Sequence, residues 1–225
     1  MSTYQQPPQA QRRREYSTIL MPHQIALMMI SPYTGKIEER DARTVALAAS
    51  IAELIMMGKV TEPQPFGFNG LKGMELVDPR PTGIAVLDIL LEPMQEWWTR
   101  SIYRMMSNNL PRQVLSIALQ DCEFFGLIRR IEEPIGFNRY GTFQVLEVGY
   151  VTGLMQHCRQ VAMNPEAFPW RDVTLTALAC EGGLSNELFP DLGWFQRSSV
   201  TRNLVHYSSV AGLVRAYKNA RDSSN

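Results

Sequence analysis

The amino-acid sequence predicts a mainly α-helical protein, a helical bundle with a protruding β-hairpin and one small additional hairpin or loop. Two observations predict this fold class. Apolar residues recur at the helical period through most of residues 42–221. One stretch, residues 127–146, instead has the pattern of a strand, a turn and a second strand. Helices that share one core leave such a hairpin standing out of the bundle.

Turn and capping residues mark the first helix. Residues 23–30 form a short apolar run, and residues 31–35 (Ser-Pro-Tyr-Thr-Gly) supply a turn. Asp41 is expected to cap a helix over residues 42–57, because its carboxylate can accept a hydrogen bond from an unpaired N–H at the helix start. Gly58 suits the left-handed position at which helices end.

Proline and glycine divide the next part of the chain. Residues 60–78 hold two prolines and several glycines, which predicts a loop or a small hairpin. Thr82 is expected to cap the following helix. Pro93 is expected to break that helix, because proline lacks an N–H and clashes with the preceding turn. A further helix is expected over residues 94–105.

Asn109 and Gly126 enclose the next helix, over residues 111–125. Asn109 is expected to cap it, Pro111 fits its first turn, and Gly126 stops it. A hairpin follows, with its turn over residues 132–138. The pattern predicts the remaining elements as strands over residues 127–131 and 140–146, and helices over residues 150–163, 171–181, 195–207 and 210–221.

The chain of 225 residues is expected to form one domain over residues 16–221. Residues 1–15 are predicted to be a disordered polar tail, and residues 222–225 a frayed C-terminus. The formal net charge is zero, from 22 basic and 22 acidic side chains. This balance disfavours nucleic-acid binding, because release of counterions from phosphates requires a basic surface.

Cysteine usage and hydropathy predict a cytoplasmic protein. The cysteines, Cys122, Cys158 and Cys180, are odd in number and lie in apolar helical stretches, which indicates free buried thiols in a reducing compartment. The N-terminus lacks the apolar segment of a signal peptide. The longest apolar run, residues 25–30, is far shorter than the about 20 residues that span a bilayer. Any membrane association is therefore expected to be peripheral.

The sequence contains no recognisable catalytic or metal-binding motif. Its three histidines lie in separate elements, without the spacing of a zinc helix, and no Cys-x-x-Cys, Walker A loop, EF-hand loop or nucleophile elbow occurs. We therefore expect no enzyme activity, no metal and no cofactor.

The predicted hairpin turn is the feature most typical of a binding surface. It exposes Ile135 and Phe137 between Arg129, Arg130 and Arg139. Such an apolar tip can enter the interfacial zone of a bilayer while the arginines meet anionic head groups, each contributing about 1 kcal/mol. The alternative is that the two apolar side chains pack on a neighbouring helix or subunit.

A short basic run in the N-terminal tail is a second candidate site. Arg12, Arg13 and Arg14 can recruit an acidic protein partner, although a solvated tail is the simpler interpretation of any single triplet.

Five segments in a fixed order resemble a known family. They are the apolar segment and glycine turn of residues 25–36, the helix end of residues 52–60, the Pro-Thr-Gly helix start of residues 81–88, the glycine-terminated helix of residues 112–128, and Arg171-Asp172 before an apolar helix. Their order and spacing over about residues 17–217 resemble the Golgi phosphoprotein 3 family.

This resemblance implies a helical bundle, a protruding β-hairpin that forms homo-oligomers, and no catalysis. Eukaryotic members bind phosphatidylinositol 4-phosphate on the cytosolic face of the Golgi. They link glycosyltransferase tails to coatomer, with arginines of the N-terminal tail contributing to the coat contact. Arg12, Arg13 and Arg14 resemble that cluster. Bacterial relatives have no assigned role.

The lipid pocket of those members uses a tryptophan and arginines from two helices, and this sequence matches it in part. Arg112 falls on one arginine position. Leu115 and Leu47 stand where further arginines are expected. Arg43, one turn before Leu47 on the same helix face, can substitute. No tryptophan occurs in residues 33–41.

The leading hypothesis is a peripheral membrane adaptor that binds anionic lipid, with phosphatidylinositol 4-phosphate as the candidate head group. The hairpin tip would act with a basic face made of Arg43, Arg112, Arg129, Arg130 and Arg139. One alternative is a structural subunit whose hairpin completes a protein assembly. Another is a winged-helix-like regulator that binds nucleic acid, since an arginine-bearing hairpin follows a helix.

Overall fold

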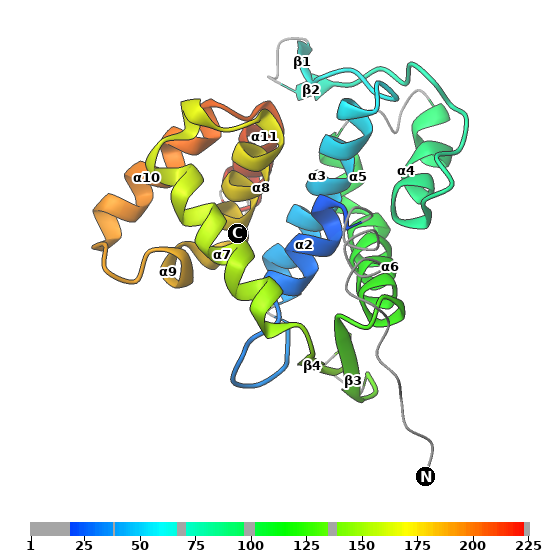
Figure 1. Ribbon diagram of the computed structural model, residues 1–225. Helices are drawn as coiled ribbons and strands as arrows, with labels where there is room; N and C mark the ends of the chain where they lie inside the picture. The colour runs from blue at the N-terminus through cyan, green and yellow to red at the C-terminus, as the bar shows by residue number, and fades with distance from the viewer. Residues whose placement is uncertain (1–18, 38, 67–70, 97–101, 135–138, 223–225) are drawn as a thin grey trace.

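The computed structural model describes residues 19–37, 39–66, 71–96, 102–134 and 139–222. The chain folds into a helical bundle with two small β-hairpins at opposite ends (Figure 1), which confirms the predicted fold class. Its elements, in order, are α2 (Met21–Met28), α3 (Glu39–Met56), β1 (Gln64–Phe66), β2 (Leu71–Gly73), α4 (Ala85–Gln95), α5 (Ile102–Ser107), α6 (Leu110–Phe124), β3 (Ile128–Glu132), β4 (Thr142–Val145), α7 (Val148–Met163), the 3-10 turn η2 (Pro165–Ala167), α8 (Trp170–Ala179), the kinked turn η3 (Cys180–Leu184), α9 (Ser185–Leu188), α10 (Trp194–His206) and α11 (Ser209–Asp222).

Helix α2 lies at the centre of the bundle. All eight of its residues are buried, and it packs against α3, α6, α7 and α8. A helix that is buried all round must satisfy its polar side chains internally. His23 does so by accepting the N–H of Leu20 at Nδ1 (3.0 Å), so that Nε2 carries the proton and donates to Asp121 Oδ2 (3.0 Å). Gln24 Nε2 donates to the hydroxyl of Tyr150 (3.1 Å).

A buried carboxylate joins three helices of the core. Glu53 of α3 accepts the backbone N–H of Met21 at 2.7 Å and a guanidinium N–H of Arg171, from α8, at 3.0 Å. The Glu53 side chain is only 4% exposed. Two charge-assisted bonds compensate the loss of water around this charge.

The predicted glycine stops are confirmed. Gly58 and Gly126 adopt φ values of +66° and +70°. After each, the next N–H reaches back to the last turn: Lys59 donates to Leu54 O and Leu127 to Cys122 O, both at 2.9 Å. This bonding satisfies carbonyl groups that the helix leaves unpaired at its C-terminus. Gly126 thereby sets the point at which α6 gives way to β3.

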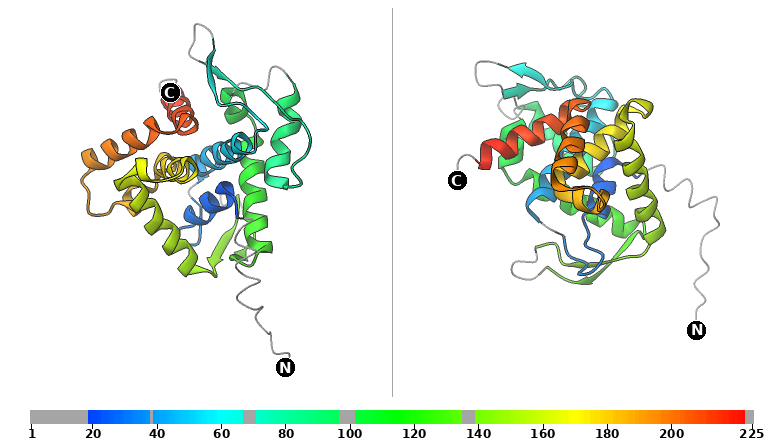
Figure 2. Two further views of the ribbon diagram at one scale, coloured as in Figure 1. Left: turned by 45° about the horizontal axis from the view of Figure 1, so that its top comes forward. Right: turned by 90° about the vertical axis from the view of Figure 1, so that its left-hand side faces the viewer.

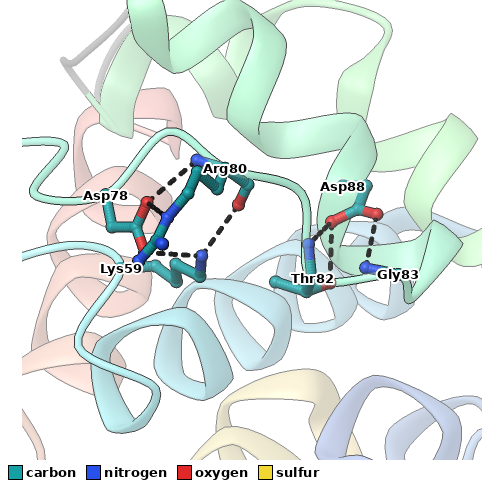
Figure 3. A network of polar contacts seen from close by, with 6 residues as sticks. All are labelled: Lys59, Asp78, Arg80, Thr82, Gly83 and Asp88. Carbon is teal, nitrogen blue, oxygen red and sulfur yellow. Dashed lines mark hydrogen bonds and ion pairs between the residues drawn. The ribbon is translucent and has the colours of Figure 1, made fainter.

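The helix caps predicted at Asp41 and Thr82 are wrong. Helix α3 starts at Glu39, so Asp41 lies inside its first turn and pairs with Lys218 of α11 at 3.3 Å. Thr82 does not cap α4, which starts at Ala85. Instead Asp88, inside that helix, accepts the N–H and hydroxyl of Thr82 and the N–H of Gly83, as Figure 3 shows. The Asp88 carboxylate therefore fixes the loop before the helix, whereas the prediction had a loop residue, Thr82, capping the helix.

A second polar cluster beside it ties the end of α3 to the loop that leads into α4 (Figure 3). Lys59 Nζ donates to Asp78 Oδ2 and to the carbonyl of Arg80, both at 2.8 Å. The Arg80 guanidinium donates to both Asp78 oxygens at 3.0 and 2.9 Å. Hydrogen bonds from Arg80 and then Lys59 hold the pKa of Asp78 well below its usual range.

The segment around Pro93 also differs from its prediction. Helix α4 continues past Pro93 to Gln95, so the break predicted at the proline is wrong, although the helix ends two residues beyond it. The predicted helix over residues 94–105 is divided between the end of α4 and α5, and residues 97–101 lie outside the described part. Asn109 makes no side-chain cap; Asn108 Oδ1 accepts the N–H of Leu110 at 2.8 Å instead.

Strands β1 and β2 form the small additional hairpin that the glycine- and proline-rich segment predicted. They pair antiparallel, with Pro65 opposite Lys72, at the end of the bundle where α3 terminates (Figure 1). The larger hairpin, β3–β4, lies at the opposite end, beyond the C-terminus of α6.

Candidate functional site

The β3–β4 hairpin is a pair of antiparallel strands with one irregularity. The two strands pair antiparallel from Ile128 opposite Val145 to Glu132 opposite Thr142, with an irregularity between Arg130 and Glu132. An extra residue of this kind turns neighbouring side chains outward, and Ile131 is 61% exposed. The two views of Figure 2 show the hairpin extending from the bundle at the end where α6 finishes.

The turn of residues 31–37 packs against the outer edge of β4. The N–H of Phe143 donates to Gly35 O at 2.9 Å, and the Phe143 ring is buried. Gly35 has a φ of +65°, and a Cβ at this position would overlap the carbonyl oxygen of Phe143. Only glycine therefore lets the turn approach the strand this closely.

The Gly35→Ala variant should lose more stability than Gly58→Ala. Both glycines have a left-handed φ, but a Cβ on Gly58 meets no atom within 4 Å. The Gly58 variant carries only the backbone penalty, about 1 kcal/mol. Overlap with Phe143 should add about 1 kcal/mol or more for Gly35. Urea unfolding of both variants measures the difference, and equal losses would show that the turn does not constrain the hairpin.

The three hairpin arginines differ in what they contact. Arg130 donates from Nη1 to Tyr140 O at 2.7 Å, pairs with Glu123 at 3.4 Å, and stacks over the Phe143 ring at 4.8 Å. It is a structural residue of the hairpin. Arg129 and Arg139 are exposed. These two are therefore the hairpin cations best placed to meet an external anion.

Exposed apolar side chains gather at the same end of the molecule. They come from the 31–37 turn, the last residue of α6, strand β3 and the β4–α7 junction. We call this surface the hairpin end; its apolar members are Tyr33 (96% exposed), Phe124 (87%), Ile131 (61%), Leu146 (40%) and Val148 (61%). Several exposed apolar side chains beside basic ones are typical of a surface that binds a membrane or another protein.

The other predicted arginines do not join this surface as one face. Arg112 is exposed in the first turn of α6, about 20 Å from the hairpin at the far end of that helix, from the rise of 1.5 Å per residue. Arg43 is half-buried in the second turn of α3, which follows the 31–37 turn. The structure therefore brings together the hairpin arginines, with Arg43 nearer to them than Arg112.

The two positions where the resemblance expects arginines are filled by core residues. Leu47 of α3 and Leu115 of α6 are both fully buried, in a region where these two helices pack against each other. A buried leucine cannot present a charge to a head group. The other residues proposed from the sequence, Arg12, Arg13, Arg14, Ile135 and Phe137, lie outside the described part of the chain.

The cysteines are placed for packing rather than for chemistry. Burial raises the pKa of Cys158 to about 11 and that of Cys180 to about 12, and it also raises the pKa of Cys122. Thiols with such pKa values stay protonated at neutral pH and are poor nucleophiles. Among the described residues, no three His, Cys, Asp or Glu side chains gather where they could hold a metal ion.

Sequence reasoning missed most of the apolar hairpin end. Phe124 is exposed and its neighbour Phe125 is half-buried, and periodicity alone could not tell the two apart at the end of the helix. Tyr33 and Val148 are single apolar residues outside any periodic stretch. No helix in the described ranges is long and apolar enough to cross a bilayer.

The chain matches the model of a known protein family. The model of the Golgi phosphoprotein 3 (GPP34) family matches residues 21–221, from the first residue of α2 to near the end of α11. No curated protein is similar enough to the chain to count as a match.

Proposed function

Since the chain belongs to the Golgi phosphoprotein 3 (GPP34) family, we propose that it is a non-enzymatic peripheral membrane adaptor that binds anionic lipid through its hairpin end. Membership is consistent with a Golgi-associated adaptor. The observation that carries the lipid proposal is the cluster of exposed apolar side chains beside Arg129 and Arg139. Apolar groups would enter the interfacial zone, and the arginines would remain at the level of the head groups.

Charge, rather than one head group, would drive this binding. Leu47 and Leu115 are buried where the family's phosphoinositide pocket is expected to hold arginines, so two of its cations are missing. Phosphatidylserine and phosphatidylinositol 4-phosphate should therefore recruit the protein equally at matched surface charge. Flotation with vesicles of the two compositions tests this, and a clear preference for the phosphoinositide would indicate a specific pocket.

Acidic substitutions at the hairpin end should weaken vesicle binding strongly. The Phe124→Asp/Ile131→Asp double variant removes two apolar side chains, each contributing about 1.5–3 kcal/mol when fully buried. It also adds two charges that an anionic surface repels. We expect the partition coefficient on phosphatidylserine-containing vesicles to fall at least about tenfold. Sedimentation of the full-length protein with these vesicles is the measurement.

The chain offers a matched control for this experiment. Val77 is also 61% exposed, but it lies in the loop next to the end of α3, at the opposite end of the bundle from β3–β4. Val77→Asp should bind vesicles as the unmodified protein does. A similar loss in both variants would mean that added charge, and not the hairpin end, controls binding.

The same surface could instead contact a second copy of the chain. Light scattering on the Phe124→Asp/Ile131→Asp variant separates the two roles. A fall in oligomeric mass, with unchanged vesicle binding, would favour a hairpin-mediated homo-oligomer. The arginine tail, Arg12 to Arg14, remains a proposed contact for a protein cargo or coat.

A further inference from the structure

A polar cavity of about 310 Å³ lies on the side of the bundle built by η3, α9, α10 and α11. Figure 1 shows these elements apart from the β3–β4 hairpin, so the cavity is separate from the hairpin end. Its lining includes Glu181, Ser185, Trp194, Arg197, Ser198 and Arg215. Its volume suits a small molecule rather than a protein segment.

One positive charge of this cavity has no partner carboxylate among the residues that the structure describes. Arg215 is neutralised by Glu181, to which it donates from Nε at 2.8 Å and from Nη2 at 2.6 Å. Arg197 is half-buried, and its recorded guanidinium contact is one long bond to Phe189 O at 3.4 Å. Within the described part of the chain, no carboxylate lies within ion-pair distance of Arg197. The excess charge of the cavity is therefore positive.

The neighbouring charges do not cancel this excess. Lys218 donates to the carbonyl of Glu181 and pairs with Asp41 at 3.3 Å. The nearby groups thus form two ion pairs, Arg215 with Glu181 and Lys218 with Asp41, and Arg197 is left over. Planar guanidinium groups bind carboxylate and phosphate oxygens through parallel hydrogen bonds.

The uncharged lining also suits an oxyanion. Ser185 and Ser198 are hydroxyl-bearing residues of the wall, and Asn186 adds a side-chain amide. Such groups can donate hydrogen bonds to a ligand that carries several acceptor oxygens. The acidic side chain of Glu181 is already engaged by Arg215, so it would not repel an anion as a free carboxylate would.

Trp194 supplies an apolar surface at the rim of the cavity. Its side chain is 68% exposed, although its ring meets that of Phe195 edge-on at 4.8 Å. An indole exposed beside polar groups can stack on a planar ligand.

We propose that this cavity binds a small organic oxyanion, a phosphate or a carboxylate, that bears a planar ring. The oxyanion bonds to Arg197 and the hydroxyl groups, and the ring stacks on Trp194. This site is independent of the lipid surface, because none of its residues belongs to the hairpin end.

Calorimetric titration of the full-length protein with phenyl phosphate, benzoate and inorganic phosphate tests the proposal. Phenyl phosphate and benzoate distinguish the two oxyanions, and inorganic phosphate measures binding without a ring. We expect at least one ring-bearing anion to bind more tightly than inorganic phosphate. Arg197→Ala should weaken it at least about tenfold, the loss typical of one charge-assisted contact.

Two controls make the test specific. Arg202 is exposed on the same helix but does not line the cavity, so Arg202→Ala should leave affinity unchanged within about twofold. Trp194→Ala should remove the advantage of the ring, whereas Phe195→Ala should retain it. Urea unfolding verifies that each variant is folded. Absence of saturable binding of all three anions, or equal losses in Arg197→Ala and Arg202→Ala, would overturn the proposal.

Discussion

Introducing an arginine at Leu115 should unfold the protein instead of creating a lipid pocket. Leu115 is fully buried in α6, in the core that this helix shares with α3. Loss of the leucine removes about 2 kcal/mol of apolar burial, and an unpaired buried charge adds several kcal/mol more. We expect Leu115→Arg to lose at least about 5 kcal/mol, which is comparable with the whole stability of many domains. Circular dichroism during heating is the measurement.

A matched variant isolates the effect of burial. Gln113 is exposed on the same helix, two residues earlier, so Gln113→Arg adds the same charge in water. It should change the free energy of unfolding by less than about 0.5 kcal/mol. If Leu115→Arg instead folds normally and gains a preference for phosphatidylinositol 4-phosphate, the family's pocket is latent here and charge-only binding is wrong.

The Arg171→Met variant should lose about 3 kcal/mol of stability. Arg171 is the only side chain recorded, among the described residues, as an ion-pair partner of Glu53. Without it, the Glu53 carboxylate stays buried with one backbone N–H, that of Met21. Breaking a buried pair costs about 3–5 kcal/mol, and the value is reduced here because Arg171 is 30% exposed. Urea unfolding with a fixed slope gives the difference.

The exposed pair between Arg80 and Asp78 provides the comparison. Its closest contact, 2.9 Å, is as short as that between Arg171 and Glu53, but the Arg80 side chain is 84% exposed. Arg80→Met should leave the urea midpoint unchanged, because water and salt screen such a pair. Equal shifts in the two variants would show that burial of Glu53 is not what makes its ion pair matter.

The parts of the fold that local chemistry decides were predictable. Gly58 and Gly126 end their helices because a left-handed φ is available to glycine at little steric cost. The β3–β4 hairpin follows from the loss of helical periodicity after Gly126. Each of these depends on a few adjacent residues, which a sequence displays directly.

The predictions that were wrong concern side chains whose partners the local pattern does not reveal. Asp41 was expected to cap a helix, but its partner is Lys218, from the other end of the chain. Thr82 was expected to cap α4, whereas its hydroxyl donates a hydrogen bond to Asp88 inside that helix. An aspartate side chain can serve either as a helix cap or as an ion-pair partner, so the sequence pattern alone cannot tell which role it has.

The candidate site was predicted in outline only. The hairpin and its arginines were expected together, and the structure places them together. It also shows that Arg130 is bound to Glu123 and Tyr140, which no spacing rule reveals. Arg112 was separated from the hairpin by the length of α6. The cavity beside Arg197 was invisible in the sequence, because its walls come from four elements and its charge depends on which carboxylate Arg215 takes.

The complete burial of α2 has a consequence during synthesis. It is the first helix of the described part to leave the ribosome, yet its surface is covered only when α8 arrives, about 150 residues later. At roughly 5–20 residues per second, this apolar segment waits on the order of ten seconds or more without its partners. The nascent chain is thus exposed to aggregation for most of its own translation. Its core is complete only after the C-terminal half has been synthesised.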